Sequence, residues 1–213
     1  MTDASNEWAA LATVAMLVVY ELAVVWAQRR QPMRLARSAH AALRADWMAA
    51  VSAQPGSEVL AVQTLRNALM SASLTASTAV LGLMGAVSLI APSLQAVFGE
   101  SSPLAGHISI RLALELLMVT LLCTSFVANA MAVRFYNHAG FIAGMPVGSD
   151  ARLRWAAVGV VHIRRAGMCY SWGLRHMILV APVLAAIAYP LAGLVVGALV
   201  VTLLYVFDRI DDI

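Results

Sequence analysis

The feature that most constrains this chain is an uncharged run over residues 68–91. It contains no Asp, Glu, Lys or Arg. At ~1.5 Å per helical residue, its roughly 24 residues are long enough to cross a bilayer core of ~30 Å. Composition agrees, because 62% of the 213 residues are hydrophobic and only 12% are charged, whereas average soluble domains carry roughly 25% charged residues. The sequence therefore predicts an integral membrane protein.

The hydrophobic runs predict an all-α fold, a membrane four-helix bundle forming a single transmembrane domain over residues 1–213. The predicted spans cover about residues 8–27, 68–91, 109–133 and 177–207. The last run is longer than one straight span needs and contains Pro182 and Pro190. We expect one long kinked helix there, since Ala188-Tyr189-Pro190 offers no polar turn.

The two segments between spans, residues 28–66 and 134–176, are predicted to lie in the cytoplasm. Residues 33–54 show the apolar spacing of an amphipathic helix lying in the membrane interface. Ser57 and Asp150 are the expected N-caps of the helices that follow them.

Arginine distribution predicts the orientation. Every arginine except Arg111 and Arg209 falls in the two predicted cytoplasmic segments, and there is no lysine. The positive-inside rule then places both termini outside the cytoplasm, with the protein in the inner cell membrane. The arginines lack an interleaved aromatic platform, which argues against a nucleic-acid partner.

Polar and basic side chains gather at the cytoplasmic ends of the predicted spans. Guanidinium groups match phosphate or carboxylate oxygens in pairs, and topology alone does not require the neighbouring amides. The alternative is that these arginines only fix topology and lie among lipid headgroups. The candidate anion- or lipid-headgroup-binding residues are Arg29, Arg66, Asn67, Arg134, Asn137, His138 and Arg175.

Glu21 is the isolated acid of the first predicted span. A carboxylate in hydrocarbon is costly unless it is protonated, paired or hydrated. We expect an ion pair with an arginine such as Arg66 or Arg134. A role in handling protons or cations, or simple exposure at the interface, are the alternatives.

A stripe of small side chains follows one face of the helix predicted over residues 68–91. Its members are Ser71, Thr75, Thr78, Gly82 and Gly85. Small residues allow close helix packing in lipid, whereas hydroxyls can line a conduction path, so both interpretations stay open. Gly193 and Gly197 indicate a second helix-contact face, which could lie between subunits.

Chemical motifs are sparse. His138, His162, Cys169 and His176 have no recognised ligand spacing, and no nucleophile-elbow or P-loop motif occurs. We therefore expect no metal, no cofactor and no enzymatic activity.

Three short runs resemble a known family. They are the run from Val59 to Met70, VLAVQTLRNALM, then Arg134-Phe135-Tyr136-Asn137, and finally Tyr205-Val206-Phe207-Asp208. In this order they resemble the family named domain of unknown function 599, multi-pass membrane proteins of bacteria and plants. The resemblance covers nearly the whole chain and implies a four-span membrane protein without an assigned activity.

Two functional hypotheses follow. The first is an oligomeric channel or transporter for a small ion or anion, with the stripe lining the path. The second is a structural or accessory subunit of a membrane complex that binds lipid or partner helices. The expected partners are membrane lipids and either copies of this chain or other membrane proteins.

Overall fold

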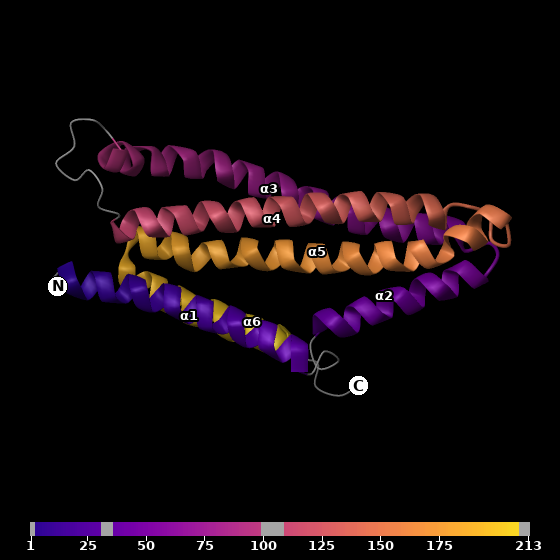
Figure 1. Cartoon of the computed structure of the whole chain (residues 1–213), viewed down its shortest axis with the longest axis horizontal. Helices are drawn as coiled ribbons and strands as arrows, with labels where there is room; N and C mark the ends of the chain where they lie inside the picture. The colour runs from indigo at the N-terminus through magenta and orange to yellow at the C-terminus, as the bar shows by residue number, and fades with distance from the viewer. Residues whose placement is uncertain (1–2, 31–35, 99–108, 209–213) are drawn as a thin grey trace. The chain divides into compact units, whose positions relative to one another are not determined.

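The computed structural model describes residues 3–30, 36–98 and 109–208, and these ranges are almost entirely helical (Figure 1). The helices are α1 (Asp3–Arg30), α2 (Ala36–Ala53), α3 (Glu58–Phe98), α4 (Ile110–Ala143), α5 (Asp150–Ala188) and α6 (Pro190–Asp208). All except α2 are long and apolar enough to cross a membrane. The predicted all-α membrane fold is confirmed, with five candidate spans in place of four.

The prediction of one kinked helix over residues 177–207 is wrong. α5 ends at Ala188 and α6 begins at Pro190, and α6 runs back along α5 (Figure 1). Proline lacks an N–H and disfavours helical geometry at the residue before it, yet it suits the first position of a new helix. The turn needs no polar side chain, because Tyr189 N donates to Ala185 O at 2.8 Å and Tyr189 O accepts from Ala192 N at 2.9 Å.

The glycines of α6 allow this close return. A Cβ atom at Gly193 would lie 2.5 Å from Ala186 Cβ and 2.8 Å from its Cα. A Cβ at Gly197 would overlap Met16 of α1. The Gly193–Gly197 face is therefore a helix-contact face within one chain.

Contacts divide the chain into two compact units. The first contains α1, residues 78–98 of α3, residues 110–124 of α4, residues 175–188 of α5, and α6. Its core includes Leu17, Leu122, Leu179 and Val183. In this unit α1 and α6 run parallel, since Thr13 lies near Gly197 and Tyr20 contacts Asp208.

The second unit has a hydrophobic core of its own. It contains α2, residues 58–77 of α3, residues 125–143 of α4 and residues 150–174 of α5. Met48, Leu65, Tyr136, Ile142 and Ile163 form part of its core. α3, α4 and α5 thus contribute to both units.

Three helices are longer than a bilayer requires. α3 has 41 residues, α4 has 34 and α5 has 39. At ~1.5 Å per residue, each exceeds a ~30 Å hydrocarbon core by roughly 20 Å or more. Parts of these helices must therefore lie outside the hydrocarbon, and the predicted spans 68–91 and 109–133 are only the apolar parts of α3 and α4.

The helix caps differ in part from the predicted ones. Ser149 rather than Asp150 caps α5, because its Oγ accepts from Arg152 N at 3.2 Å. Ser57 holds the predicted N-cap position of α3, since its carbonyl accepts from Ala61 N at 2.9 Å, but its hydroxyl donates to Val51 O and Gln54 O of the preceding turn, both at 2.7 Å.

Gly193→Ala tests the tight return of α6. The added methyl would meet the backbone and Cβ of Ala186, so we expect the free energy of unfolding to fall by about 1–3 kcal/mol. The measurement is thermal unfolding in detergent. Gly85→Ala is the matched control, since its Cβ would meet nothing within 4 Å. If Gly193→Ala left the unfolding transition unchanged, that result would contradict the close packing of α6 against Ala186.

Candidate functional site

A buried ionic cluster joins three helices of the first unit. Arg175 on α5 is only 3% exposed. Its Nε lies 2.5 Å from Glu21 Oε1 on α1, and its Nη1 donates to Asp208 Oδ2 on α6. The Tyr20 hydroxyl also donates to Asp208 Oδ2, at 3.1 Å, and the Arg175 guanidinium lies 4.8 Å from the centre of the Tyr20 ring.

This cluster assigns Glu21 a partner different from those that the sequence suggested. The acid pairs with Arg175 rather than with Arg66 or Arg134. Ionic attraction is strong in a low-dielectric site, provided that both partners stay bonded. Two carboxylates thus engage Arg175 and link α1, α5 and α6, while its Nη2 is buried without a hydrogen-bond partner.

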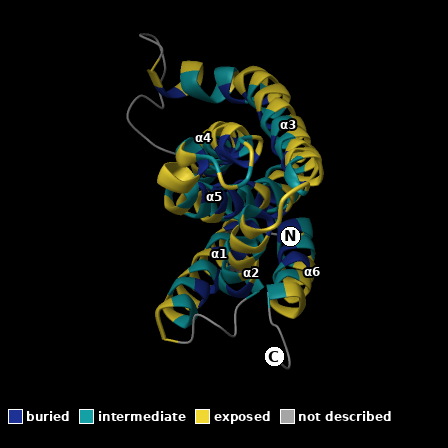
Figure 2. Ribbon diagram, turned by 90° about the vertical axis from the view of Figure 1, so that its right-hand side faces the viewer, coloured by how far each residue is buried: buried dark blue, intermediate teal, exposed yellow. Residues whose placement is uncertain are grey.

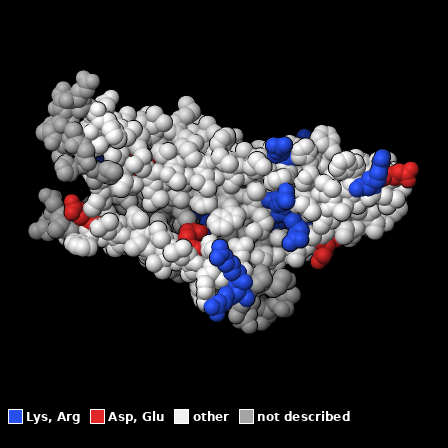
Figure 3. All heavy atoms as spheres, viewed as in Figure 1, with Lys and Arg blue, Asp and Glu red and all other residues white. Residues whose placement is uncertain are grey.

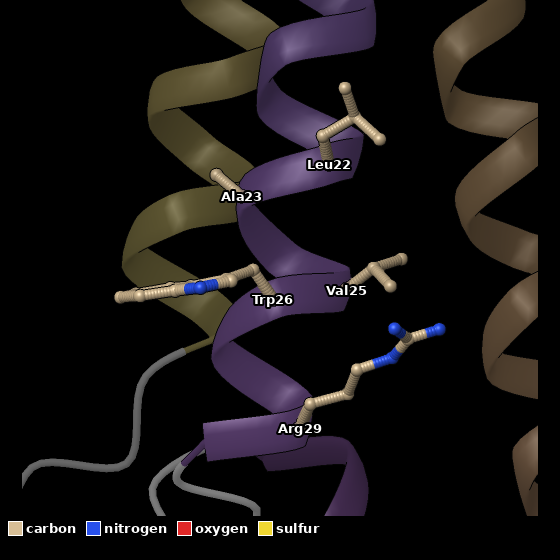
Figure 4. A pocket seen from close by; sticks show the side chains of 5 residues that line it. All are labelled: Leu22, Ala23, Val25, Trp26 and Arg29. Carbon is tan, nitrogen blue, oxygen red and sulfur yellow. The ribbon is translucent and has the colours of Figure 1, made fainter.

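Arg29 lies at the end of α1 beside an apolar hollow of about 450 Å³. The other lining residues, also on α1, are Leu22, Ala23, Val25 and Trp26 (Figure 4). The neighbouring Arg30 guanidinium stacks 4.7 Å from the Trp26 ring centre. An apolar helix segment that ends in tryptophan and arginine is typical of a helix that enters the lipid headgroup region.

The remaining predicted anion-binding residues lie on the surface of the second unit. Arg66 and Asn67 are exposed on α3, and Arg134, Asn137 and His138 are exposed on α4. On the visible face, the basic side chains form separate patches rather than one continuous surface (Figure 3). An anion held by these five residues would remain in contact with water or lipid headgroups.

The small-residue stripe stays largely at the surface of α3. Only 17% of the most apolar stretch of this helix is buried, and Figure 2 shows α3 mostly in the colours of exposed and intermediate residues. Ser71 Oγ donates to Asn67 O at 3.2 Å and Thr75 Oγ1 to Ser71 O at 3.0 Å. Donation to the helix's own backbone satisfies a hydroxyl hydrogen in an apolar environment.

The glycine end of the stripe is not a uniform packing face. A Cβ atom at Gly82 would lie 2.9 Å from Leu122 Cδ2 on α4, whereas one at Gly85 would meet nothing within 4 Å. Thr78 is exposed. Within a single chain, therefore, the stripe neither encloses a path nor forms one continuous helix contact.

The structure reveals two buried polar groups that the sequence did not single out as sites. Arg152 donates to Ile142 O, to Met145 O at 3.2 Å and to Ser52 Oγ at 3.1 Å. It closes the carboxyl end of α4, where a cation is favoured. The sequence signal was weak, because nothing local separates Arg152 from its exposed neighbour Arg154.

The second buried group joins α4 to α5. Ser125 Oγ donates to Gly173 O at 2.7 Å, and Asn129 Nδ2 donates to Ser125 O at 2.8 Å. A Cβ atom at Gly173 would overlap the Asn129 side chain. Gly173 therefore leaves the space that the buried amide of Asn129 needs.

The histidines do not assemble into a larger group. The His138 and His162 rings lie 5.5 Å apart, and Phe135 lies 5.7 Å from His162. Among the residues that the structure describes, no group of three or more His, Cys, Asp or Glu could hold a metal ion.

Replacing Arg175 tests the ionic cluster. Arg175→Leu leaves Glu21 and Asp208 unpaired, so we expect the free energy of unfolding to fall by about 3–5 kcal/mol, measured by thermal unfolding in detergent. Arg29→Gln, at an exposed position of α1, should have little effect. Adding Glu21→Gln and Asp208→Asn to Arg175→Leu should recover much of the loss. No loss in the single variant would contradict the role of the cluster.

Comparison with known proteins bears on the family but not on a mechanism. No curated protein matches the chain, and no solved structure matches it. A family model described as "Protein of unknown function, DUF599" matches residues 8–213. The resemblance carried by the three sequence runs is thereby confirmed, and the chain belongs to the DUF599 family.

Proposed function

We propose that this protein is an oligomeric channel or transporter for a small ion or anion in the inner membrane. In this proposal the stripe of α3, Ser71 to Gly85, faces the path in an assembly of several copies. The observation that carries the proposal is the exposure of this stripe along a helix whose most apolar stretch is only 17% buried.

The hydroxyl chemistry suits a path of this kind. Ser71 and Thr75 donate their hydrogens to their own helix. Their oxygen lone pairs remain available and can replace part of the hydration of a passing ion. Arg66 on α3 and Arg134 on α4 are exposed, and their positive charge would attract anions toward the path. This proposal contains no catalytic step.

The second candidate is a structural or accessory subunit of a membrane complex. It is favoured by the length of α3, α4 and α5, which extend past the hydrocarbon core and contribute to a second unit with its own core. In this alternative the exposed face of α3 meets lipid or the helices of partner proteins, and no ion crosses.

The orientation that we propose follows from five spans rather than four. The prediction of both termini outside assumed an even number of spans. In the structure α1 and α6 run parallel, and Arg29 and Arg30 end α1. If the positive-inside rule applies to this end, the N-terminus lies outside and the C-terminal end of α6 lies in the cytoplasm.

Thr75→Leu tests the proposed path. In vesicles containing the purified protein, we expect this change to lower ion flux by about tenfold or more, an effect of ~1.4 kcal/mol on the barrier. Native mass spectrometry should show the same oligomer as in the unmodified protein. Thr202→Leu is the matched control, since Thr202 is exposed on α6 and makes the same type of bond, to Ala198 O at 2.8 Å.

Two results would favour the accessory subunit instead. One is the absence of flux above that of empty vesicles with the unmodified protein. The other is dissociation of the assembly by Thr75→Leu without any change in flux.

Reporter fusions test the orientation. A fluorescent protein that folds only in the cytoplasm should be bright at the C-terminus, and alkaline phosphatase, which is active only outside, should be inactive there. The same pair fused before Asp3 should give the reverse result. Active phosphatase at both ends would restore the four-span orientation.

A further inference from the structure

Arg44 on α2 is a half-buried cation without a counterion among the described residues. Its Nε and Nη2 are buried and have no hydrogen-bond partner. None of the ion pairs in the described part of the chain includes it. Burial lowers the pKa of the Arg44 guanidinium. Burying donors of a charged group without acceptors is costly, so the fold holds a side chain that lacks a partner.

Arg44 lines a cavity of about 330 Å³ within the second unit. The lining comes from α2 through α5, and it is mostly apolar and aromatic with a few hydroxyl groups. Its residues are Arg44, Trp47, Thr64, Leu65, Ala68, Ser71, Tyr136, Ile163 and Tyr170. An apolar cavity of this size with a few polar groups is typical of a small-molecule site.

Gly167 shows that the fold leaves room for the guanidinium. A Cβ atom at this position of α5 would overlap Arg44 Nε, Cζ and Nη2. Glycine inside a helix costs about 1 kcal/mol relative to alanine. The space that Arg44 occupies is thus a specific feature of α5.

The other charged groups around the cavity do not neutralise Arg44. Asp46 is exposed, and the nearest ionisable neighbour that affects Arg44 is the hydroxyl of Tyr136. Arg165 and Cys169 lie on the same helix as Tyr170, and neither supplies an acceptor to Arg44. The described residues therefore leave this site without an anionic partner.

We propose that the Arg44 cavity binds a phosphate group, carried either by an anionic lipid or by free phosphate. A guanidinium donates two parallel hydrogen bonds to phosphate oxygens. Thr64 and Ser71 add hydroxyl groups to the lining, and the aromatic and aliphatic walls accept the apolar part of a lipid. Tryptophan and tyrosine are enriched at the depth where lipid headgroups lie. The site shares Ser71 with the proposed path, and its binding test does not require any transport activity.

The test compares stability with ligand affinity in the full-length protein. Thermal unfolding is measured in neutral detergent alone, with added phosphatidylglycerol, with added phosphatidylcholine and with inorganic phosphate. We expect phosphatidylglycerol, inorganic phosphate or both to raise the midpoint for the unmodified protein, whereas phosphatidylcholine raises it less. A response to phosphatidylglycerol alone identifies a lipid headgroup, and a response to inorganic phosphate identifies the free ion as a sufficient ligand.

Variants separate a binding role from a structural one. Arg44→Leu should fold at least as stably as the unmodified protein without ligand, because it removes an unpaired buried charge, and its ligand response should vanish. Native mass spectrometry should show an apparent affinity for the responding ligand reduced by about tenfold or more. Gly167→Ala, which displaces the guanidinium, should weaken the same response.

Arg154→Gln, at an exposed arginine of the same helix as Gly167, is the matched control and should respond like the unmodified protein. Three results would overturn the proposal. The first is no response of the unmodified protein to either phosphate source. The second is an undiminished response of Arg44→Leu. The third is a ligand-free Arg44→Leu that is markedly less stable than the unmodified protein, which would assign Arg44 a structural role.

Discussion

The structure depends on one constraint, which is the cost of leaving a polar group unsatisfied away from water. Along a helix, backbone N–H and C=O groups satisfy one another by hydrogen bonds within the helix. At the turn around Tyr189 the backbone continues to do so, and Ser71 and Thr75 do the same with their side chains. Charged groups need side-chain or carbonyl partners, which come from the same helix for Arg111 and Glu115 and from other helices for Arg175.

Two arginines with buried guanidinium nitrogens, Arg175 and Arg44, meet that constraint differently. Arg175 receives carboxylates from α1 and α6 and so holds three helices together. Arg44 receives none from the described residues and lies against an open cavity. The same residue type thus acts as an internal tie in one unit and as an unmatched donor in the other. Arg44 has two buried donors without a partner and lines a cavity, whereas Arg175 has one, Nη2, and is held by two carboxylates.

The sequence predicted the fold where the signal was local. The uncharged run at 68–91 and the arginine-rich segments were enough to indicate a helical membrane protein. The separation of α5 from α6 was missed, because we assumed that a turn in lipid needs polar side chains. Pro190 and Gly193 make the turn instead, one through its fixed backbone geometry and the other through its lack of a side chain.

The candidate sites were harder to predict, because they depend on partners distant in sequence. Glu21 is 154 positions from Arg175, and no local pattern identifies that pairing. Arg44 lies in the segment predicted to be an amphipathic interfacial helix, and the burial of its guanidinium becomes visible only once Gly167 and Tyr136 are placed beside it. Exposed residues such as Arg66 and Arg134 were easier to locate, since they flank the apolar stretches of α3 and α4.

The short turn at Tyr189 also has a consequence for how the protein enters the membrane. With a single residue between α5 and α6, the chain cannot thread these two helices into the bilayer separately. They must enter together as a helical hairpin with Tyr189 leading. Arg175 and Asp208 lie toward the trailing end of this hairpin, so neither charge has to cross the full thickness of the hydrocarbon core.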